Sequence, residues 1–132
     1  MQSVSSNAVA SLLNTNLDDI NVVDISSQLT KYLGLTTVYA VRKNNVVQLM
    51  LYGDYTGSQS LTTQTFATGL PQKYKPMSDQ IASSFAVVSY ISTSPYVVPS
   101  RLAIGVDGTI RLNETSMPNG AKIVFTVTYI GA

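Results

Sequence analysis

An antiparallel all-β fold, a β-sandwich or barrel, is predicted from three features of the sequence. Short apolar runs are rich in Val, Ile, Leu, Thr and Tyr, as strands are, and turn residues separate them. The five prolines fall between these runs or at their ends, where a residue without a backbone N–H does not interrupt a sheet. Short strands that alternate with turns are typical of sandwiches and barrels.

The expected strands follow one another from Leu35 to the C-terminus. They cover residues 35–43, 46–52, 61–70, 80–92, 101–106, 109–113 and 122–130. Asn44-Asn45 and Asp107-Gly108 predict hairpins, because Asn, Asp and Gly tolerate the positive φ that tight turns need. A further turn is expected at Asn119-Gly120, and the proline-bounded residues 93–100 are expected to form a loop.

Residues 18–34 are compatible with two interpretations. The run from Ile20 to Ile25 has the composition of a short strand, whereas four apolar residues fit one face of a helix. These four are Ile25, Leu29, Tyr32 and Leu33. Gly34 is expected to end whichever element precedes it.

Residues 1–17 predict a short helix or coil, which Ser5 or Ser6 can cap. Its apolar residues share one face. They are Val9, Leu12, Leu13 and Leu17. So thin a stripe is marginal for a lone helix in water, which leaves a frayed terminus docked on its own domain or a parallel coil joining copies of the chain. We therefore divide the chain into a helical or trimerisation segment, residues 1–17, and a β-sandwich head, residues 18–132.

Composition narrows the classes of function. The 132 residues suffice for one domain with one core, but only 11% of them are charged, against about 25% in a typical domain. A net charge of +1 without a basic stripe argues against binding of nucleic acid. No run approaches the length of about 18 apolar residues that a membrane span needs, so no membrane insertion is expected. So little charge suits a protein that stays assembled or works outside the cytoplasm.

The side chains that usually carry catalysis are scarce. Without cysteine and histidine, the chain lacks thiolate ligands, the commonest metal ligand and the usual general base. Its seven carboxylates show no spacing typical of a catalytic pair or a calcium loop. We therefore expect no enzyme, no metal and no cofactor.

The eight tyrosines favour a binding surface instead, because a phenol ring offers apolar and polar contact together. Tyr52, Asp54 and Tyr55 surround a glycine at the end of an expected strand. Tyr96 and Arg101 lie in or next to the proline-bounded loop. Loops presented by a rigid sheet often carry function, so these five residues are the predicted saccharide contacts. The alternative is that each tyrosine only closes the core at a strand end.

Apolar residues also stand on both faces of some expected strands. In the strand at residues 46–52, the inward set is expected to be Val47, Leu49 and Leu51. The other face still carries Val46, Met50 and Tyr52. A sheet with one face in water should alternate more cleanly. A second sheet, the N-terminal segment or another subunit is therefore expected to cover these residues, and the low charge favours a subunit.

Several stretches resemble the tail-fibre and baseplate receptor-binding proteins of tailed bacteriophages. "VSSNAVASLLN", Val4 to Asn14, is similar to the S-x-N-A-V-x-x-x-L segment that often precedes their distal domains. "VRKNNVVQLML", "GLPQKYKP" and the final "TVTYIGA" are similar to the layout of their heads. That layout has a Lys-Asn hairpin, a Leu-Pro-x-x-Tyr-x-Pro crossing, an Asp-Gly hairpin and a closing strand that ends in Tyr-Ile.

The resemblance implies a homotrimeric head at the tip of the phage tail, extracellular when functional. It would bind a bacterial cell-surface saccharide and contact other tail or baseplate proteins. A trimeric tip domain without a ligand is the alternative, and a polysaccharide-degrading enzyme is the least favoured. Saccharide clefts of such heads often use His or Trp, which this chain lacks, so no ligand contact is carried over from the family.

The resemblance also assigns a structural role to the crossing at Gly69–Pro76. Two prolines exclude this segment from the centre of a sheet. Leu70 and Tyr74 would pack in the core, while Lys73 and Lys75 stay in solvent.

Overall fold

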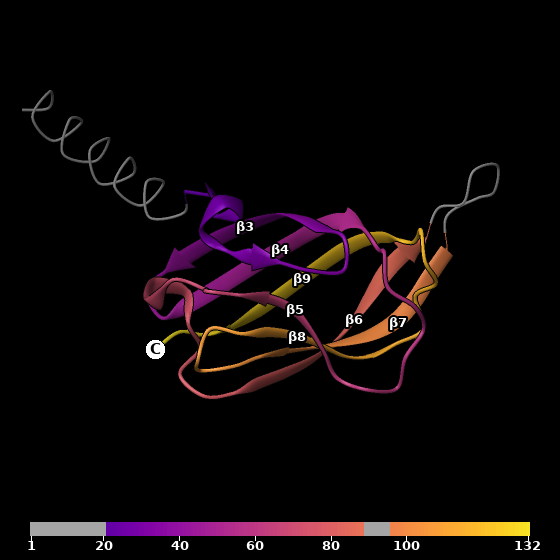
Figure 1. Ribbon diagram of the computed structural model, residues 1–132. Coiled ribbons are helices and arrows are strands. Elements are labelled where there is room, and N and C mark those ends of the chain that lie inside the picture. The colour runs from indigo at the N-terminus through magenta and orange to yellow at the C-terminus, as the bar shows by residue number, and fades with distance from the viewer. Residues whose placement is uncertain (1–20, 89–95) are drawn as a thin grey trace, which may run out of the picture.

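Residues 21–88 and 96–132, the part of the chain that the computed structural model describes, form two antiparallel β-sheets packed face to face (Figure 1). This confirms the predicted all-β sandwich. The strands are β1 (Val23–Asp24), β2 (Thr30–Lys31), β3 (Leu35–Lys43), β4 (Val46–Asp54), β5 (Gln64–Thr68), β6 (Gln80–Val88), β7 (Tyr96–Ile104), β8 (Ile110–Thr115) and β9 (Lys122–Ile130). Two short 3-10 helices are η1 (Ser26–Gln28) and η2 (Gln72–Tyr74). The expected helix within residues 1–17 lies outside the described residues.

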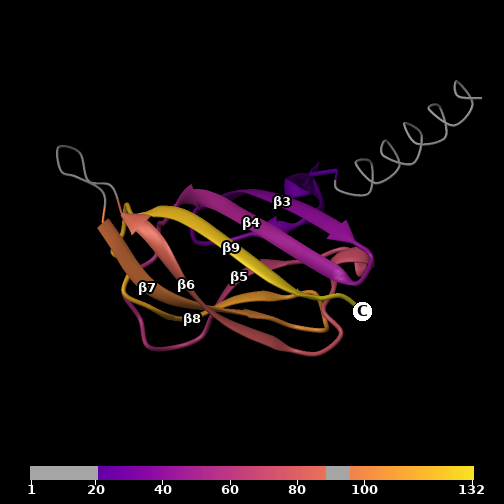
Figure 2. The ribbon, with the colours of Figure 1, turned by 180° about the vertical axis from the view of Figure 1, so that it is seen from behind.

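The strand order is β1-β3-β4-β9 in the four-stranded sheet and β2-β5-β8-β7-β6 in the five-stranded sheet. We call them sheet A and sheet B. The edge strands β9 and β6 run beside each other (Figures 1 and 2). Just before β6, the Met77 N–H donates to the Ile130 carbonyl at 2.9 Å. The two sheets are thus joined along this side.

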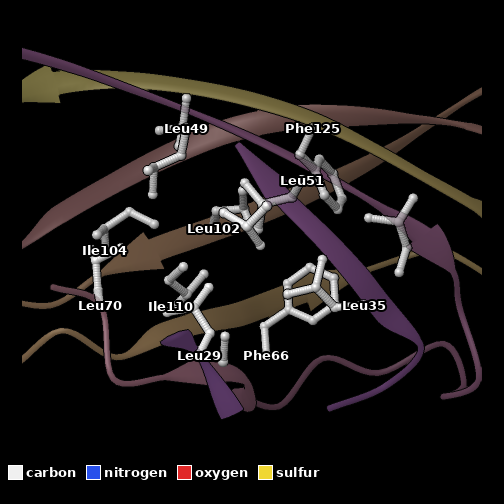
Figure 3. Close-up of a cluster of buried hydrophobic side chains, with 14 of the residues drawn as sticks. Leu29, Leu35, Leu49, Leu51, Phe66, Leu70, Leu102, Ile104, Ile110 and Phe125 are labelled. Atoms are coloured by element: carbon white, nitrogen blue, oxygen red, sulfur yellow. The ribbon is translucent and has the colours of Figure 1, made fainter. Parts of the chain in front are cut away.

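Alternate side chains of both sheets fill the core (Figure 3). In β4, Val47, Leu49 and Leu51 are fully buried, which confirms the predicted inward set. In β9 every second residue is buried and the residues between them are exposed. Phe66 of β5 and Phe125 of β9 meet edge to face across the core, with ring centroids 6.2 Å apart. The two sheets therefore share one continuous apolar interior.

The three predicted turns are present. Asn44, with a φ of 54°, lies in the turn from β3 to β4, and Gly108, with a φ of 84°, lies in the loop from β7 to β8. Gly120, with a φ of 89°, lies between β8 and β9. Asn and Gly are the residues that adopt this left-handed conformation at least cost, which is why these turns were readable from the sequence.

The expected loop at residues 93–100 is wrong in its second half, because residues 96–100 belong to β7. Pro99 lies inside this strand, which pairs with β6 along its whole length. On the other side, β8 pairs with β7 only from Ser100 onward. In the described part of the chain, Pro99 therefore has an open edge beside it, where a strand tolerates a proline.

Residues 21–34 follow neither interpretation throughout. Of the run expected as a strand, only Val23–Asp24 forms one, and a continuous helix is wrong, because η1 is short and the strand β2 follows it. Ile25 and Leu29 are buried at the two ends of η1. Asp24 accepts a hydrogen bond from the Ser26 N–H at 2.9 Å. Hydrogen bonds from Ser26 hold the pKa of Asp24 below its usual range.

The crossing at Gly69–Pro76 carries the chain over the end of the sandwich at which the C-terminus lies (Figure 1). Leu70 is buried, and its N–H donates to the Gly108 carbonyl at 3.1 Å. Tyr74 is 5% exposed, and its carbonyl accepts a 2.6 Å hydrogen bond from the Tyr129 hydroxyl. Burial raises the pKa of Tyr129, so the hydroxyl stays protonated and able to donate. Leu70 and Tyr74 pack as expected, which fits a structural crossing.

Arg42 and Lys73, far apart along the chain, meet at this same end. The Arg42 side chain donates to three main-chain oxygens, those of Asn44 at 2.8 Å, Lys73 at 2.8 Å and Ala132 at 2.9 Å. It thereby holds together the β3–β4 hairpin, η2 and the residue that follows β9 by two positions. Lys73 is exposed as expected, whereas Lys75 is half-buried. We call this end of the sandwich the hairpin end.

Candidate ligand-binding site

At the opposite end, the loop of residues 55–63 between β4 and β5 meets the loop of residues 116–121 between β8 and β9. We call it the loop end (Figure 1, at the right). The Tyr55 N–H donates to the Ala121 carbonyl at 2.8 Å, and the Gly120 N–H donates to the Tyr55 carbonyl at 2.7 Å. These two bonds continue the β4–β9 ladder past the end of β4, so the loops begin as a paired unit.

Two amide side chains tie the same loops together. The Asn119 Nδ2 donates to the carbonyl of Thr56 at 2.8 Å and to that of Gly57 at 3.4 Å. The Gln59 Nε2 donates to the Ser116 carbonyl at 3.0 Å. Each bond runs from one loop to the other, so the position of either loop depends on its partner.

Tyr55 supports the first loop from below. Tyr55 is 1% exposed, and its hydroxyl donates to the Ser58 carbonyl at 2.7 Å. The same hydroxyl accepts a hydrogen bond from the Gln64 Nε2 at 3.4 Å. Gly57 lies so close that an added Cβ would be 2.5 Å from the Tyr55 oxygen. The loop therefore closes over the tyrosine because glycine, without a side chain, stands at this position.

A shallow depression of about 290 Å³ lies between the two loops. Its lining residues are Gln59, Ser60, Leu61, Thr115 and Ser116. Ser60 and Thr115 bind each other through two main-chain hydrogen bonds, of 3.1 and 2.9 Å. Leu61 is 88% exposed. The lining thus combines hydroxyl, amide and main-chain polar groups with one apolar side chain, and none of these five residues is charged.

The floor of the depression is held by a buried pair of hydroxyls. Ser100 and Thr115 are both buried, and their side-chain oxygens are 2.6 Å apart. The Met117 N–H also donates to the Thr115 hydroxyl, at 3.0 Å. Thr115 therefore fixes three segments at once: β7, β8 and the loop that follows β8.

The residues predicted as saccharide contacts do not form one cluster. Tyr52 stands on the outer face of sheet A, 36% exposed, with its ring edge-on to Tyr39 at 6.0 Å. Asp54 ends β4 and forms an ion pair with Lys122. Tyr55, next along the chain, points into the core. The "LYGDYTGSQS" stretch thus divides its side chains among the outer face of sheet A, the loop end and the interior.

Arg101 lies on β7 of sheet B and faces Glu114, with 3.9 Å between its Nε and the carboxylate. Its neighbour Leu102 points inward, so Arg101 points outward from sheet B, away from the outer face of sheet A that carries Tyr52. Tyr96 is the first residue of β7, and its backbone alone is described. Its partner Glu114 directly precedes the lining residue Thr115 in β8, but Arg101 itself does not line the depression. A role of these residues in binding stays a prediction.

Sequence reasoning missed most of the residues that line the depression. Ser60 lies between the expected strands at residues 46–52 and 61–70, but Thr115 and Ser116 stand in "ETSMPNGA", where only the turn at Asn119-Gly120 was expected. Small polar residues in a loop were the only signal. Thr115 pairs with Ser60, which is far away in the chain, and this pairing is set by the order of the strands in sheet B.

In residues 21–88 and 96–132, no group of three potential metal ligands comes together. The same described residues contain no helix long and apolar enough to cross a bilayer. Each buried side-chain nitrogen and oxygen in the described part of the chain has a hydrogen-bond partner.

Neither the protein-family models nor the curated proteins contain a match to this sequence. Among solved structures, the receptor binding protein (gp15) of Listeria phage PSA is similar over 99% of this chain and 77% of its own, with a TM-score of 0.64 and 16% sequence identity. The two chains share a fold. The sandwich that the phage resemblance implied is therefore confirmed at the level of the fold.

Proposed function

We propose that this chain is the receptor-binding head of a phage tail-fibre or baseplate protein, which attaches the virion to a saccharide on the host cell. The observation that carries the proposal is the fold, similar over almost the whole chain to that of a phage receptor binding protein. The motifs from Val4 to Asn14 and from Gly69 to Pro76 support it independently. The place of action would be the tip of the tail, outside the cell.

The loop end suits a receptor site because it faces away from the start of the head. β1 pairs antiparallel with β3, with Val23 opposite Ala40 and Asp24 opposite Tyr39. Followed backward from Val23, the chain therefore runs toward Lys43 and the hairpin end. The first described residues of the head therefore lie toward the hairpin end, and the loop end lies at the other end of the sandwich.

The depression suits a neutral saccharide. Serine and threonine hydroxyls and the Gln59 amide can donate to and accept from sugar hydroxyls, and main-chain groups add further partners. The exposed Leu61 offers an apolar surface to the C–H face of a sugar ring. Arg101, which faces Glu114 on the neighbouring strand β8, would extend the site along sheet B.

Replacing Leu61 by alanine tests the site. The side chain makes little contact within its own chain, so stability should not change, while binding to host cells or arrayed glycans should weaken about tenfold, or about 1.4 kcal/mol. Met77→Ala removes another exposed apolar side chain, at the hairpin end, and is the matched control. Full binding by Leu61→Ala and by Arg101→Ala would exclude the depression as the site. Tyr55→Ala is unsuitable as a probe, because Tyr55 is in the core.

We further propose that three copies assemble through the outer face of sheet A. Exposed apolar side chains follow this face across its strands. They are Val22, Val46, Tyr52, Val124 and Ile130, of which Val46 lies opposite Ile130 and Tyr52 opposite Val124. Exposed apolar side chains of this kind on a chain with little charge favour an interface, and a three-fold arrangement closes it by symmetry. Three identical heads would also turn weak saccharide binding into strong attachment through avidity, and other tail or baseplate proteins would hold the trimer.

Light scattering should therefore give about three times the chain mass of 14.2 kDa. Val124→Glu places a charge in the proposed interface and should yield monomers, whereas Val106→Glu, at another exposed valine, in the β7–β8 loop, should not. Removal of residues 1–17 should weaken the trimer and leave the heads folded. A monomer at micromolar concentration from the full chain would refute the assembly.

A purely structural tip domain is the second candidate function. It is favoured by one observation: the buried polar side chains of the described residues are all satisfied internally, so none is held ready for a ligand. Failure of the folded trimer to bind host cells would favour this candidate. Release of sugars from host polysaccharide would instead reveal an enzyme.

A further inference from the structure

At the loop end, Asn119 and Gly120 both bind the neighbouring loop, the asparagine through its side-chain amide and the glycine through its main-chain N–H. Asn119 donates to the carbonyls of Thr56 and Gly57, and Gly120 donates to the carbonyl of Tyr55. We call these bonds the clasp. Both residues are exposed to solvent. No atom lies within 4 Å of the position that a Gly120 Cβ would occupy.

An Asn-Gly pair has a chemistry of its own. The main-chain nitrogen of the glycine, once it gives up its proton to water or hydroxide, can attack the Cγ of the asparagine side chain. A new C–N bond forms, ammonia leaves, and a five-membered succinimide results. Water then opens the ring at either carbonyl and leaves aspartate or isoaspartate. Glycine permits this reaction best because it has no side chain to obstruct the approach.

We propose that Asn119–Gly120 is a self-modification site that the closed loop end holds unreacted. In the structure, the attacking nitrogen donates its proton to the Tyr55 carbonyl at 2.7 Å, which opposes its deprotonation. The amide that would be lost is fixed to the Thr56 carbonyl at 2.8 Å. Both reacting groups are thus bound to the opposite loop, and the reaction requires the clasp to open first.

The modification would also prevent the clasp from closing again. An aspartate at position 119 has no N–H to donate, and its carboxylate would face the carbonyl oxygens of Thr56 and Gly57. Isoaspartate would in addition lengthen the main chain inside a tight turn. The loop of residues 55–63 would lose its partner, and the depression between the two loops would widen. If the proposed function holds, the modified head loses its receptor.

The test follows amide hydrolysis at Asn119 by peptide mass spectrometry in the full chain at mildly alkaline pH. The reaction should be at least about tenfold slower in the folded protein than in the same protein unfolded in urea, since local opening limits it. Gln59→Ala removes another bond between the two loops and should accelerate it in the folded state. Gln80→Ala is the control, because its amide donates to the Ser78 carbonyl at 3.0 Å, away from the loop end.

Equal rates in folded and unfolded protein would overturn the proposal, as would equal rates in the Gln59 and Gln80 variants. The Asn119→Asp variant separates the proposal from the proposed function. Faster hydrogen exchange at the Tyr55 and Gly120 amides of that variant supports loss of the clasp, whether or not any saccharide binds. Unchanged exchange there overturns it. Failure of the unmodified protein to bind any host saccharide refutes the proposed function alone.

Discussion

Replacing Tyr74 by alanine should lower the free energy of unfolding by about 3 kcal/mol, the usual cost of removing a buried aromatic ring. The ring is 5% exposed and closes the core at the hairpin end. Its loss would leave a cavity under η2 and loosen the carbonyl that receives the Tyr129 hydroxyl. Urea denaturation followed by tyrosine fluorescence measures the change.

Tyr32→Ala is the matched control, because that tyrosine is 47% exposed and should lose less than about 1 kcal/mol. The structural role of the crossing would be contradicted if Tyr74→Ala abolished attachment to cells and left stability unchanged. In that case Gly69–Pro76 would belong to the receptor site.

Gly34→Ala should destabilise the fold by at least about 3 kcal/mol. Two costs combine in this value: the strain of an alanine in the left-handed conformation and the overpacking around its methyl group. Gly34 has a φ of 86°, and its added Cβ would lie only 1.8 Å from the Asp54 carbonyl oxygen. Gly53 lies close to Gly34, at the place where the pairing of β4 with β3 ends. Either the strand end or the loop before β3 would have to move.

Gly120→Ala separates the two contributions, because Gly120 has a φ of 89° but no atom near the added Cβ. It should cost only about 1–2 kcal/mol, the conformational part. Similar losses from both substitutions would show that backbone strain alone limits these sites. Thermal unfolding of both variants, side by side, makes the comparison.

The parts of the fold that were predictable are those whose cause is local. The turns at Asn44 and Gly108 were predictable because few other residues accept a positive φ. The inward face of β4, with Leu49 and Leu51, was predictable because side chains alternate along a strand. Pro99 led to the wrong prediction of a loop. A strand tolerates a proline where the neighbouring strand has ended, and the end of β8 is set by another part of the chain.

The candidate site was harder to predict for the same reason. Tyr55 looked like a surface aromatic beside Asp54, yet the loop folds back over it, because Gly57 and Ser58 let the chain close on the ring. Ser60 and Thr115 carry no motif. Only the bridge between β8 and the loop after β4 makes them neighbours, and the sequence holds no local sign of it.

β9 has a consequence for the order in which the protein is made. It is synthesised after every other described strand, yet it is the whole partner of β4 on one side and supplies four buried side chains. These are Ile123, Phe125, Val127 and Tyr129. Until β9 has left the ribosome, β4 has an unpaired edge, and the nascent chain has no complete interior to collapse around. The sandwich therefore completes its folding only after β9 has left the ribosome, at the slow pace of a β-sheet with distant pairings. A cell that makes many copies at once must keep their open edges apart for that interval.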